Sequence, residues 1–271
     1  MNARFGLQST LLVHLPNKHL SEMVRLRSVS CLPPAGLNKD HVQEQARNYI
    51  SRIGEMQQKL YAGKKQAILV VLQGMDGSGK DSTTNSVFSK CSVAGIEVHN
   101  YKKPTEEEFS HDFLWRIHKN APAKGKIGVF VRSHYEDILV QRVHKWIDEE
   151  RVSTRIDAIN AFENLLSDDN ETIILKFYLH ISKEEQKRQL TERIDDPEKR
   201  WKHNDEDWKE RKLWPEYMDA YEDMINRSEI EWTIVPADKH WYRDYVVARK
   251  VCEAMEKLHL KYPEVDIKIK T

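Results

Sequence analysis

AILVVLQGMDGSGKDSTT, residues 67–84, is the stretch of the chain that decides its fold. It begins with an unbroken apolar run, 67–72, which is typical of a strand buried on both faces in a parallel sheet. Gly74 to Lys80 then match G-x-x-x-x-G-K, and a helix is expected to follow. The glycines of such a loop let backbone N–H groups converge on phosphate oxygens at a helix N-terminus, and the lysine adds a mobile positive charge. We therefore predict a phosphate site formed by Gly74, Gly77, Ser78, Gly79, Lys80, Asp81 and Ser82.

Helical and strand patterns alternate on either side of this loop. Helices are expected at 38–63, 81–89, 106–118, 134–166 and 240–258, and strands at 67–72, 96–101, 127–131, 172–179 and 231–235. A polar stretch with helical spacing separates the last two strands. Alternation of this kind predicts an α/β fold with a five-stranded, mostly parallel sheet between helices. Ligands of such sheets bind beyond the carboxyl ends of the strands, which is where the glycine-rich loop falls.

Composition excludes several classes of partner. The chain of 271 residues is 39% hydrophobic and carries 43 basic and 43 acidic residues. Because the net charge is zero, we expect neither nucleic acid nor membrane as a partner, and any phosphate site must be built locally. Three cysteines without CxxC spacing argue against a disulfide framework or a thiolate metal site. No apolar run approaches the roughly 20 residues that span a bilayer, so a soluble, cytoplasmic protein is predicted.

The length favours one large domain with flexible ends. We predict a single domain at 38–262 with a lid at about 183–215, followed by a tail at 263–271. Residues 1–37 contain only one acidic residue, Glu22, set among basic residues and serines. A flexible extension is expected there, with a weak organelle-targeting leader as the alternative.

Several stretches together resemble the second family of polyphosphate kinases. They are LQGMDGSGKDSTT (72–84), KKPTEEEFSHDFLWRIH (102–118), RSHYEDILVQRVH (132–144), KFYLHISKEEQKRQLTERIDDPEKRWK (176–202) and VPADKHWYRDYVVAR (235–249). The resemblance runs from about Leu60 to Tyr262 and includes the loop pattern G-x-D-x-x-G-K.

The resemblance implies a P-loop kinase fold like that of thymidylate kinase, with a helical lid. It also implies dependence on Mg²⁺, with Mn²⁺ as a substitute, and inorganic polyphosphate as one substrate. The other substrate would be an adenine or guanine nucleotide, because the chain is most similar to the subgroup that phosphorylates nucleoside mono- and diphosphates. The expected reactions are AMP to ADP and ADP to ATP by direct in-line transfer, in a homo-oligomer that is either a dimer or a tetramer.

Asp76 and Arg132 join Lys80 as catalytic candidates. The resemblance implies an acidic residue at Asp76, where a carboxylate can ligate Mg²⁺ or orient the attacking phosphate oxygen, and capping of the next helix is the alternative. Arg132 follows the third strand and can clamp phosphate oxygens with its planar fork. An ion pair with Glu136 or Asp137 is the alternative for this arginine. The predicted metal ligands are Asp76, Glu136 and Asp137.

The sequence departs from the family pattern near this site. Val131 stands where the family usually has Asp or Asn, and a valine can neither bind a metal nor donate a hydrogen bond. Asp81 replaces the Ser or Thr that ordinarily holds Mg²⁺, and Ser82 replaces a more usual glycine. Two rival hypotheses therefore stay open: a catalytically impaired module that binds nucleotide or polyphosphate, and a nucleotide kinase that uses ATP.

Basic residues gather after the fourth strand and predict a lid that closes over a polyanion. The resemblance favours Arg188 and Arg193 as catalytic residues of this lid. A solvated helix is the alternative, because acidic residues are equally frequent there. Lys102 and Lys103 are predicted to line the same phosphate path. The other basic residues of the cluster are Lys187, Lys199, Arg200 and Lys202.

Two more sets of residues carry expectations. Asp112 and Arg116, four residues apart on the expected helix 106–118, are predicted to form an ion pair or contact on the nucleotide side. Trp201, Trp208 and Trp214 are expected to pack in the core or at a subunit interface rather than to stack on a base.

Overall fold

Ala67–Gln73 forms β1, the central strand of a parallel sheet, in the computed structural model, which describes residues 23–264. All seven residues of β1 are buried, as the apolar run predicts. The sheet has five strands in the order β2-β3-β1-β4-β5, and every neighbouring pair is parallel. The other strands are β2 (Ile96–Asn100), β3 (Ile127–Val131), β4 (Thr172–His180) and β5 (Trp232–Pro236). The predicted α/β fold is confirmed.

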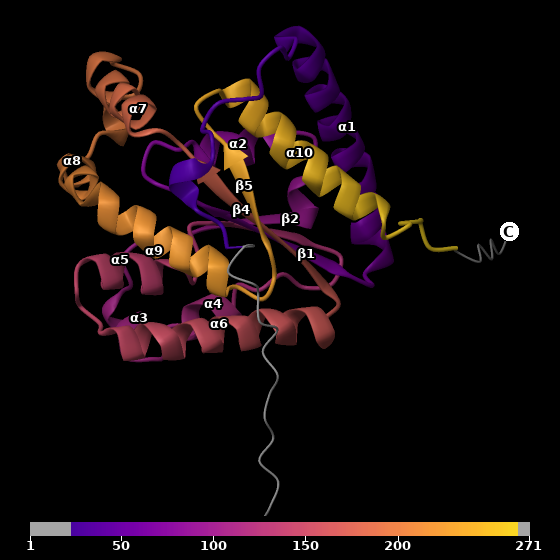
Figure 1. The fold of residues 1–271 in the computed structure, drawn as a ribbon. Coiled ribbons are helices and arrows are strands. Elements are labelled where there is room, and N and C mark those ends of the chain that lie inside the picture. The colour runs from indigo at the N-terminus through magenta and orange to yellow at the C-terminus, as the bar shows by residue number, and fades with distance from the viewer. Residues whose placement is uncertain (1–22, 265–271) are drawn as a thin grey trace, which may run out of the picture.

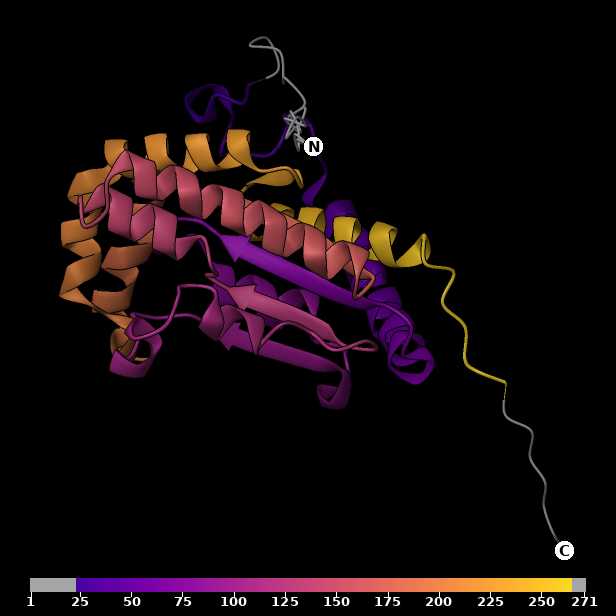
Figure 2. The same ribbon diagram turned by 90° about the horizontal axis from the view of Figure 1, so that it is seen from below.

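Helices cover both faces of the sheet (Figures 1 and 2). One face carries α1 (Lys39–Gly63), α2 (Lys80–Val87) and α10 (His240–Glu256), and the other carries α5 (Glu136–Val143), α6 (Glu149–Asp168) and α9 (Trp214–Arg227). Because both faces are covered, the carboxyl ends of the strands form the accessible edge where a ligand can bind.

The stretch between β4 and α9 is helical and lies beyond this edge (Figure 2). It consists of α7 (Lys183–Asp195), the 3₁₀ turn η4 (Arg200–Lys202), α8 (Asp205–Glu210) and the 3₁₀ turn η5 (Arg211–Leu213). Ser182 begins α7 by accepting a hydrogen bond from the Glu185 N–H. The stretch predicted as a lid is therefore helical, and its closure over a substrate stays a prediction.

Two predicted helices are each broken in the structure. The segment 106–118 forms α3 (Glu106–Phe109) and α4 (Trp115–His118), because the Asp112 side chain accepts a hydrogen bond from the Leu114 N–H and stabilises a turn between them. The segment 134–166 is divided into α5 and α6, and Lys145 in the connection has a φ of 57°. Periodicity did not reveal either break, since apolar spacing continues across both.

Residues 23–37, which were predicted to be part of a flexible extension, pack against the domain instead. Leu26 is fully buried, and its N–H donates to Glu222 Oε2 at 2.7 Å, while the Val24 N–H donates to Asn226 Oδ1 at 2.8 Å. The short 3₁₀ helix η2 (Leu26–Ser28) is thereby attached to α9. The ordered domain begins before residue 38. Residues 1–22 of the expected extension and 265–271 of the expected tail lie outside the described residues.

Within residues 23–264, no helix combines the length and hydropathy needed to cross a bilayer. The three cysteines, Cys31, Cys91 and Cys252, are free thiols.

Candidate active site

The glycine-rich loop connects the central strand to α2 and lies at the carboxyl edge of the sheet. Gly79, the residue before α2, has a φ of 91°, which is unfavourable for any residue with a side chain. A Cβ atom at Gly79 would also lie 1.8 Å from Nη1 of Arg243. Glycine is therefore required at this position for two independent reasons.

Lys80 is buried inside the loop. Its Nζ donates hydrogen bonds to the carbonyl oxygens of Gly74, at 2.6 Å, and Met75, at 3.2 Å. Burial, together with the positive charge of Arg132, lowers the pKa of Lys80 to about 8. The ammonium group thus lies in the phosphate loop, where it is bonded to neutral carbonyl oxygens. Its positive charge is therefore available to an anion.

Asp76 and Arg132 form an ion pair at the mouth of the loop. Nη2 of Arg132 lies 2.5 Å from Oδ1 of Asp76, and both side chains are partly exposed. Burial opposes ionisation of Asp76, but Arg132 and Lys80 outweigh it and hold the pKa of this carboxyl below its usual value. The alternatives for these residues are wrong: Arg132 pairs with neither Glu136 nor Asp137, and the cap of α2 is not Asp76.

A small pocket joins the loop to helices from both sides. Asp76 and Arg132 line it together with Glu136, the first residue of α5, and with Gln186 of α7. Burial raises the pKa of Glu136 despite the opposing effect of Arg132 and Lys80. The remaining lining residues are Gly74, Met75, Val140, Glu210, Tyr217 and Tyr221.

Only part of the predicted metal set meets in this pocket. Asp137 lies elsewhere, because its carboxylate accepts hydrogen bonds from Arg116 Nη2 at 3.2 Å and Gln141 Nε2 at 2.7 Å. The described part of the chain contains no group of three His, Cys, Asp or Glu side chains arranged to hold a metal ion. Asp76 and Glu136 nevertheless fit Mg²⁺, since this ion is commonly held by one or two carboxylates plus substrate phosphates.

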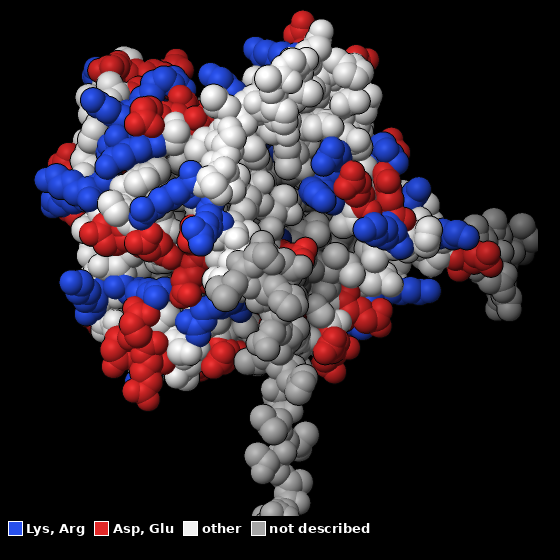
Figure 3. Space-filling view, in the orientation of Figure 1, with Lys and Arg blue, Asp and Glu red and all other residues white. Residues whose placement is uncertain are grey.

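The two predicted lid arginines have different surroundings. Arg188 is 57% exposed and pairs with Glu185 at 2.6 Å and Glu192 at 3.2 Å, both on its own helix. Arg193 instead bonds Asp207 of α8 at 2.6 Å and is close enough to Asp76 to lower the pKa of that carboxyl. Figure 3 shows acidic and basic side chains interleaved over α7 and α8. Arg193 therefore interacts with the loop carboxylate through its charge, whereas the charge of Arg188 is compensated on the lid surface, and a catalytic role for either arginine stays a prediction.

The residues predicted beside β2 do not enter the pocket. Lys102 and Lys103 are exposed on the loop after β2. Asp112 and Arg116 do not pair, because the helix breaks between them and the buried Arg116 bonds Asp137 at 3.2 Å instead. The predicted ion pair between Asp112 and Arg116 is therefore wrong, and a contact of either residue with a nucleotide stays a prediction.

Asp81, Ser82 and Ser78 are all part of the loop region, but their surroundings differ. Asp81 is exposed and accepts a hydrogen bond from Asn100 Nδ2 at 3.4 Å. Ser82 Oγ bonds the carbonyl oxygen of Gly79 at 2.9 Å. Ser78 is buried, and its Oγ has no hydrogen-bond partner among the described residues.

Two other predictions concern packing. Val131 is buried at the end of β3, in register with Leu72 and Asn100, so its side chain belongs to the core and not to the phosphate pocket. Trp201 is 79% exposed, so it does not pack in the core, and its packing at a subunit interface stays a prediction. Trp214 does pack against the core.

Sequence reasoning missed Arg243 and Gln186. Arg243 of α10 is fully buried, and its guanidinium donates to the Ser78 carbonyl oxygen at 3.2 Å and to Ser82 Oγ at 3.0 Å. Gln186 Nε2 donates to the Asp76 carbonyl oxygen at 2.9 Å and so connects α7 to the loop. A signal for Arg243 existed, because it lies three residues before Val246 on the apolar side of a predicted amphipathic helix.

The chain is similar in sequence to named phosphotransferases and similar in structure to a solved kinase. The chain is 44% identical over 216 residues to an AMP/ADP-polyphosphate phosphotransferase of Meiothermus ruber, covering 79% of this chain and 80% of the relative. It is 39% identical over 242 residues to an ADP-polyphosphate phosphotransferase of Rhodopseudomonas palustris, covering 84% and 83%. The crystal structure of Polyphosphate Kinase 2 from Arthrobacter aurescens TC1 superposes with a TM-score of 0.86 at 39% identity, covering 90% of this chain and 89% of that one.

The profile of a single family spans nearly the whole described structure. That family is described as Polyphosphate kinase 2 (PPK2), and its profile matches residues 36–263, which include the phosphate loop, the Asp76–Arg132 pair and the lid helices. The chain therefore belongs to the polyphosphate kinase 2 family.

Proposed function

We propose that the protein transfers a phosphoryl group between inorganic polyphosphate and a nucleotide, with AMP and ADP as acceptors. The observation that carries this proposal is the Asp76–Arg132 ion pair at the mouth of a phosphate loop that contains Lys80. Relatives with 44% and 39% identity are named as phosphotransferases of AMP/ADP or ADP with polyphosphate, which supports the choice of both substrates.

Lys80, Arg132 and Asp76 have different roles in the proposed phosphoryl transfer. Loop N–H groups and Lys80 bind the phosphates, because the helix N-terminus and the ammonium both favour negative charge. Arg132 offers a planar fork to the equatorial oxygens of the transferring group. Asp76, kept ionised by Arg132 and Lys80, orients the acceptor phosphate for in-line attack.

We include Mg²⁺ in the proposal, with Mn²⁺ as a substitute. Asp76 and Glu136 would hold the ion, since these two carboxylates line the pocket. A divalent ion held there would supply positive charge to the phosphates during transfer. The electrostatic contributions of Lys80 and Arg132 come from the chain itself and do not depend on the identity of the ion.

The lid, residues 183–215, is proposed to close over the polyanion. Arg193 lies near Asp76, and Gln186 connects α7 to the loop by its bond to the Asp76 carbonyl oxygen. A lid closed in this way excludes water, which strengthens the electrostatic interactions in the site and suppresses hydrolysis.

The direct test incubates the full chain, Mg²⁺ and polyphosphate with AMP, ADP and GDP in turn and measures the nucleotides formed. We expect ADP from AMP and ATP from ADP, and Lys80→Ala should abolish both. Transfer from ATP but not from polyphosphate would identify a nucleotide kinase of the ATP-using kind. Binding of both ligands without turnover would identify an impaired binding module.

A further inference from the structure

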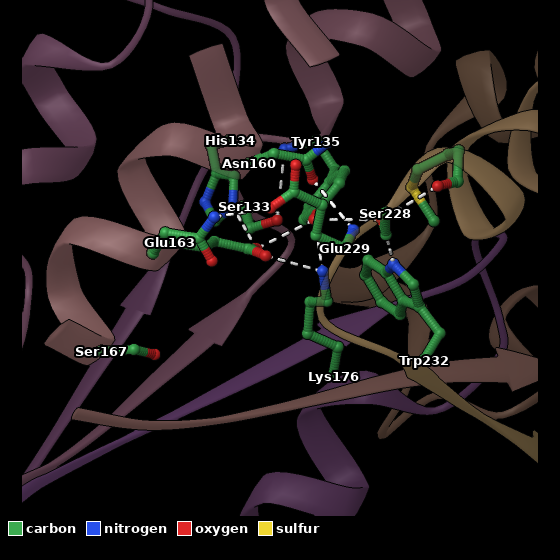
Figure 4. Close-up of polar contacts among 12 residues, drawn as sticks. Ser133, His134, Tyr135, Asn160, Glu163, Ser167, Lys176, Ser228, Glu229 and Trp232 are labelled. Atoms are coloured by element: carbon green, nitrogen blue, oxygen red, sulfur yellow. Dashed lines mark hydrogen bonds and ion pairs between the residues drawn. The ribbon is translucent and has the colours of Figure 1, made fainter. Parts of the chain in front are cut away.

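A cluster of buried charged and polar side chains lies between α6 and the sheet (Figure 4). Lys176 of β4 donates hydrogen bonds to Glu163 Oε2 at 2.6 Å and to the Tyr135 hydroxyl at 2.7 Å. That hydroxyl donates to Glu163 Oε1 at 2.9 Å, and His134 Nε2 lies 3.0 Å from the same oxygen. Glu163 of α6 is therefore the centre of the cluster.

The ionisation of this cluster is defined by its contacts. Burial opposes the charge on Glu163, but His134 and Lys176 outweigh it and lower the pKa of the carboxyl. Because the carboxylate can only accept, the Nε2 atom of His134 must carry the proton and donate it. The four side chains thus form one connected hydrogen-bond network centred on the Glu163 carboxylate.

The network does not touch the proposed substrates. None of Glu163, Lys176, His134 and Tyr135 lines the pocket beside the phosphate loop, and all four are buried. A buried ion pair adds little net stability compared with apolar side chains of the same volume. The network instead fixes the side-chain orientations of His134 and Tyr135, which lie in the turn between β3 and α5.

This turn carries two groups of the pocket. Arg132 begins it with a φ of 58°, a left-handed conformation that is disfavoured for arginine and persists only where the surroundings impose it. Glu136 ends it, and its N–H donates to the Ser133 carbonyl oxygen at 3.0 Å. Both ends of the turn face the pocket, whereas its middle residues, His134 and Tyr135, are bonded to Glu163 on the other side.

We propose that Glu163 and Lys176, acting through His134 and Tyr135, are positioning residues that hold Arg132 in the conformation in which it meets Asp76. The proposal deepens the proposed function and rests on it for its kinetic consequences. Arg132 acts on the transferring group, so a displaced guanidinium lowers kcat more than it raises the KM for nucleotide.

Two variants test the network. Glu163→Gln removes the central charge, and Tyr135→Phe removes only a hydroxyl and keeps the packed ring, so that it folds even where the first variant does not. We expect kcat for transfer from polyphosphate to ADP to fall about tenfold in each, with KM for ADP changed less than about twofold, as for loss of a transition-state contact. Tyr101→Phe is the matched control, since Tyr101 is also buried and loses one hydrogen bond, to Asn120, outside the network.

A double-mutant cycle distinguishes positioning from general support. In an Arg132→Lys background, Glu163→Gln and Tyr135→Phe should cause no further loss of kcat, because their effect passes through the guanidinium that has been replaced. Losses that multiply in full in the double variants would mean that the network acts independently of Arg132, and the proposal would be overturned.

A second readout does not depend on turnover. The guanidinium NMR resonances of Arg132, assigned by their loss in Arg132→Lys, should shift in Tyr135→Phe and stay in place in Tyr101→Phe. Unmoved resonances overturn the positioning role whatever the kinetics show. Shifted resonances in a protein that fails to transfer phosphate from polyphosphate would instead support the positioning role and contradict the proposed function.

Discussion

Three cations surround the phosphate loop, and each reaches it from a different part of the chain. Lys80 belongs to the loop itself, Arg132 follows β3, and Arg243 comes from α10. Arg132 and Arg243 have carboxylate partners, Asp76 and Asp244, whereas Lys80 contacts two backbone carbonyls. The protonation state of Lys80 is therefore the most sensitive to its surroundings.

The pH dependence of activity should report Lys80. Burial, followed by Arg132, lowers its pKa to about 8, so the ammonium is intact below that pH and is lost as the pH rises through it. We expect kcat/KM for polyphosphate to fall about tenfold per pH unit above about 8, because kcat/KM reports ionisations of the free enzyme. Lys80→Arg, which stays charged, should be slower at neutral pH but lack this decline. An unchanged decline in that variant would assign the ionisation to another group.

Arg243 should stabilise the phosphate loop through its hydrogen bonds to Ser78 and Ser82. Arg243→Met leaves the buried Ser78 carbonyl oxygen without this donor, which should cost about 1–3 kcal/mol in the free energy of unfolding. The loosened loop should also raise KM for polyphosphate. Arg249→Met on the same helix, where the side chain is only partly buried and pairs with Glu253, serves as the control and should change neither quantity appreciably. Chemical denaturation and steady-state kinetics measure the two effects, and equal effects in both variants would contradict the assignment.

At the scale of elements, the lid is bonded to the loop through α7, and α8 is bonded to α7. Gln186 reaches the Asp76 carbonyl oxygen, and the Arg193–Asp207 pair joins the two helices. Each helix begins at a side-chain cap, Ser182 for α7 and Asn204 for α8, so the break between them has a local cause. The faces of α7 then differ in function, one toward the loop and one toward solvent.

The two lid arginines make a matched pair for testing this difference. Arg193→Ala should lower kcat at least about tenfold, because a charge near the transferring group is worth about 1.4 kcal/mol or more in the transition state. Its polyphosphate affinity should also respond less to salt. Arg188→Ala removes only the exposed ion pairs of Arg188 with Glu185 and Glu192, so kcat should stay within about twofold of the unmodified protein. Comparable losses in the two variants would show that the lid closes in a way that brings both arginines to the polyanion.

At the scale of the whole molecule, the pocket is assembled from segments that are distant in sequence. Asp76 follows β1, Arg132 and Glu136 flank the turn after β3, Gln186 lies on α7, and Tyr217 lies on α9. Parallel strand order brings the carboxyl ends of β1 and β3 together. The N-terminal segment contributes indirectly, because Leu26 and Val24 bond α9 through its side chains.

The N-terminal segment should therefore stabilise the domain. Leu26→Ala should lower the free energy of unfolding by about 2–5 kcal/mol, since it removes a fully buried side chain and leaves a cavity. Leu32→Ala, in the same segment but with the leucine 51% exposed, should change it by less than about 0.5 kcal/mol. Urea denaturation of the full chain gives both values. Equal stability of the two variants would mean that the domain folds without this segment.

The sequence by itself determined the sheet and the phosphate loop, for physical reasons that are local. An apolar run such as 67–72 must be buried on both faces, and Gly74 to Lys80 can form only a tight turn that exposes N–H groups. Only the tertiary structure decided which charges meet. Arg193 bonds Asp207 of α8 whereas Arg188 bonds glutamates of its own helix, and Asp137 bonds Arg116, because the partner of a long charged side chain depends on how the elements pack. The partners of Arg243, Glu163 and Lys176 were likewise visible only in the tertiary structure. Helical or strand spacing predicts that such a position is buried but not which group it will bond.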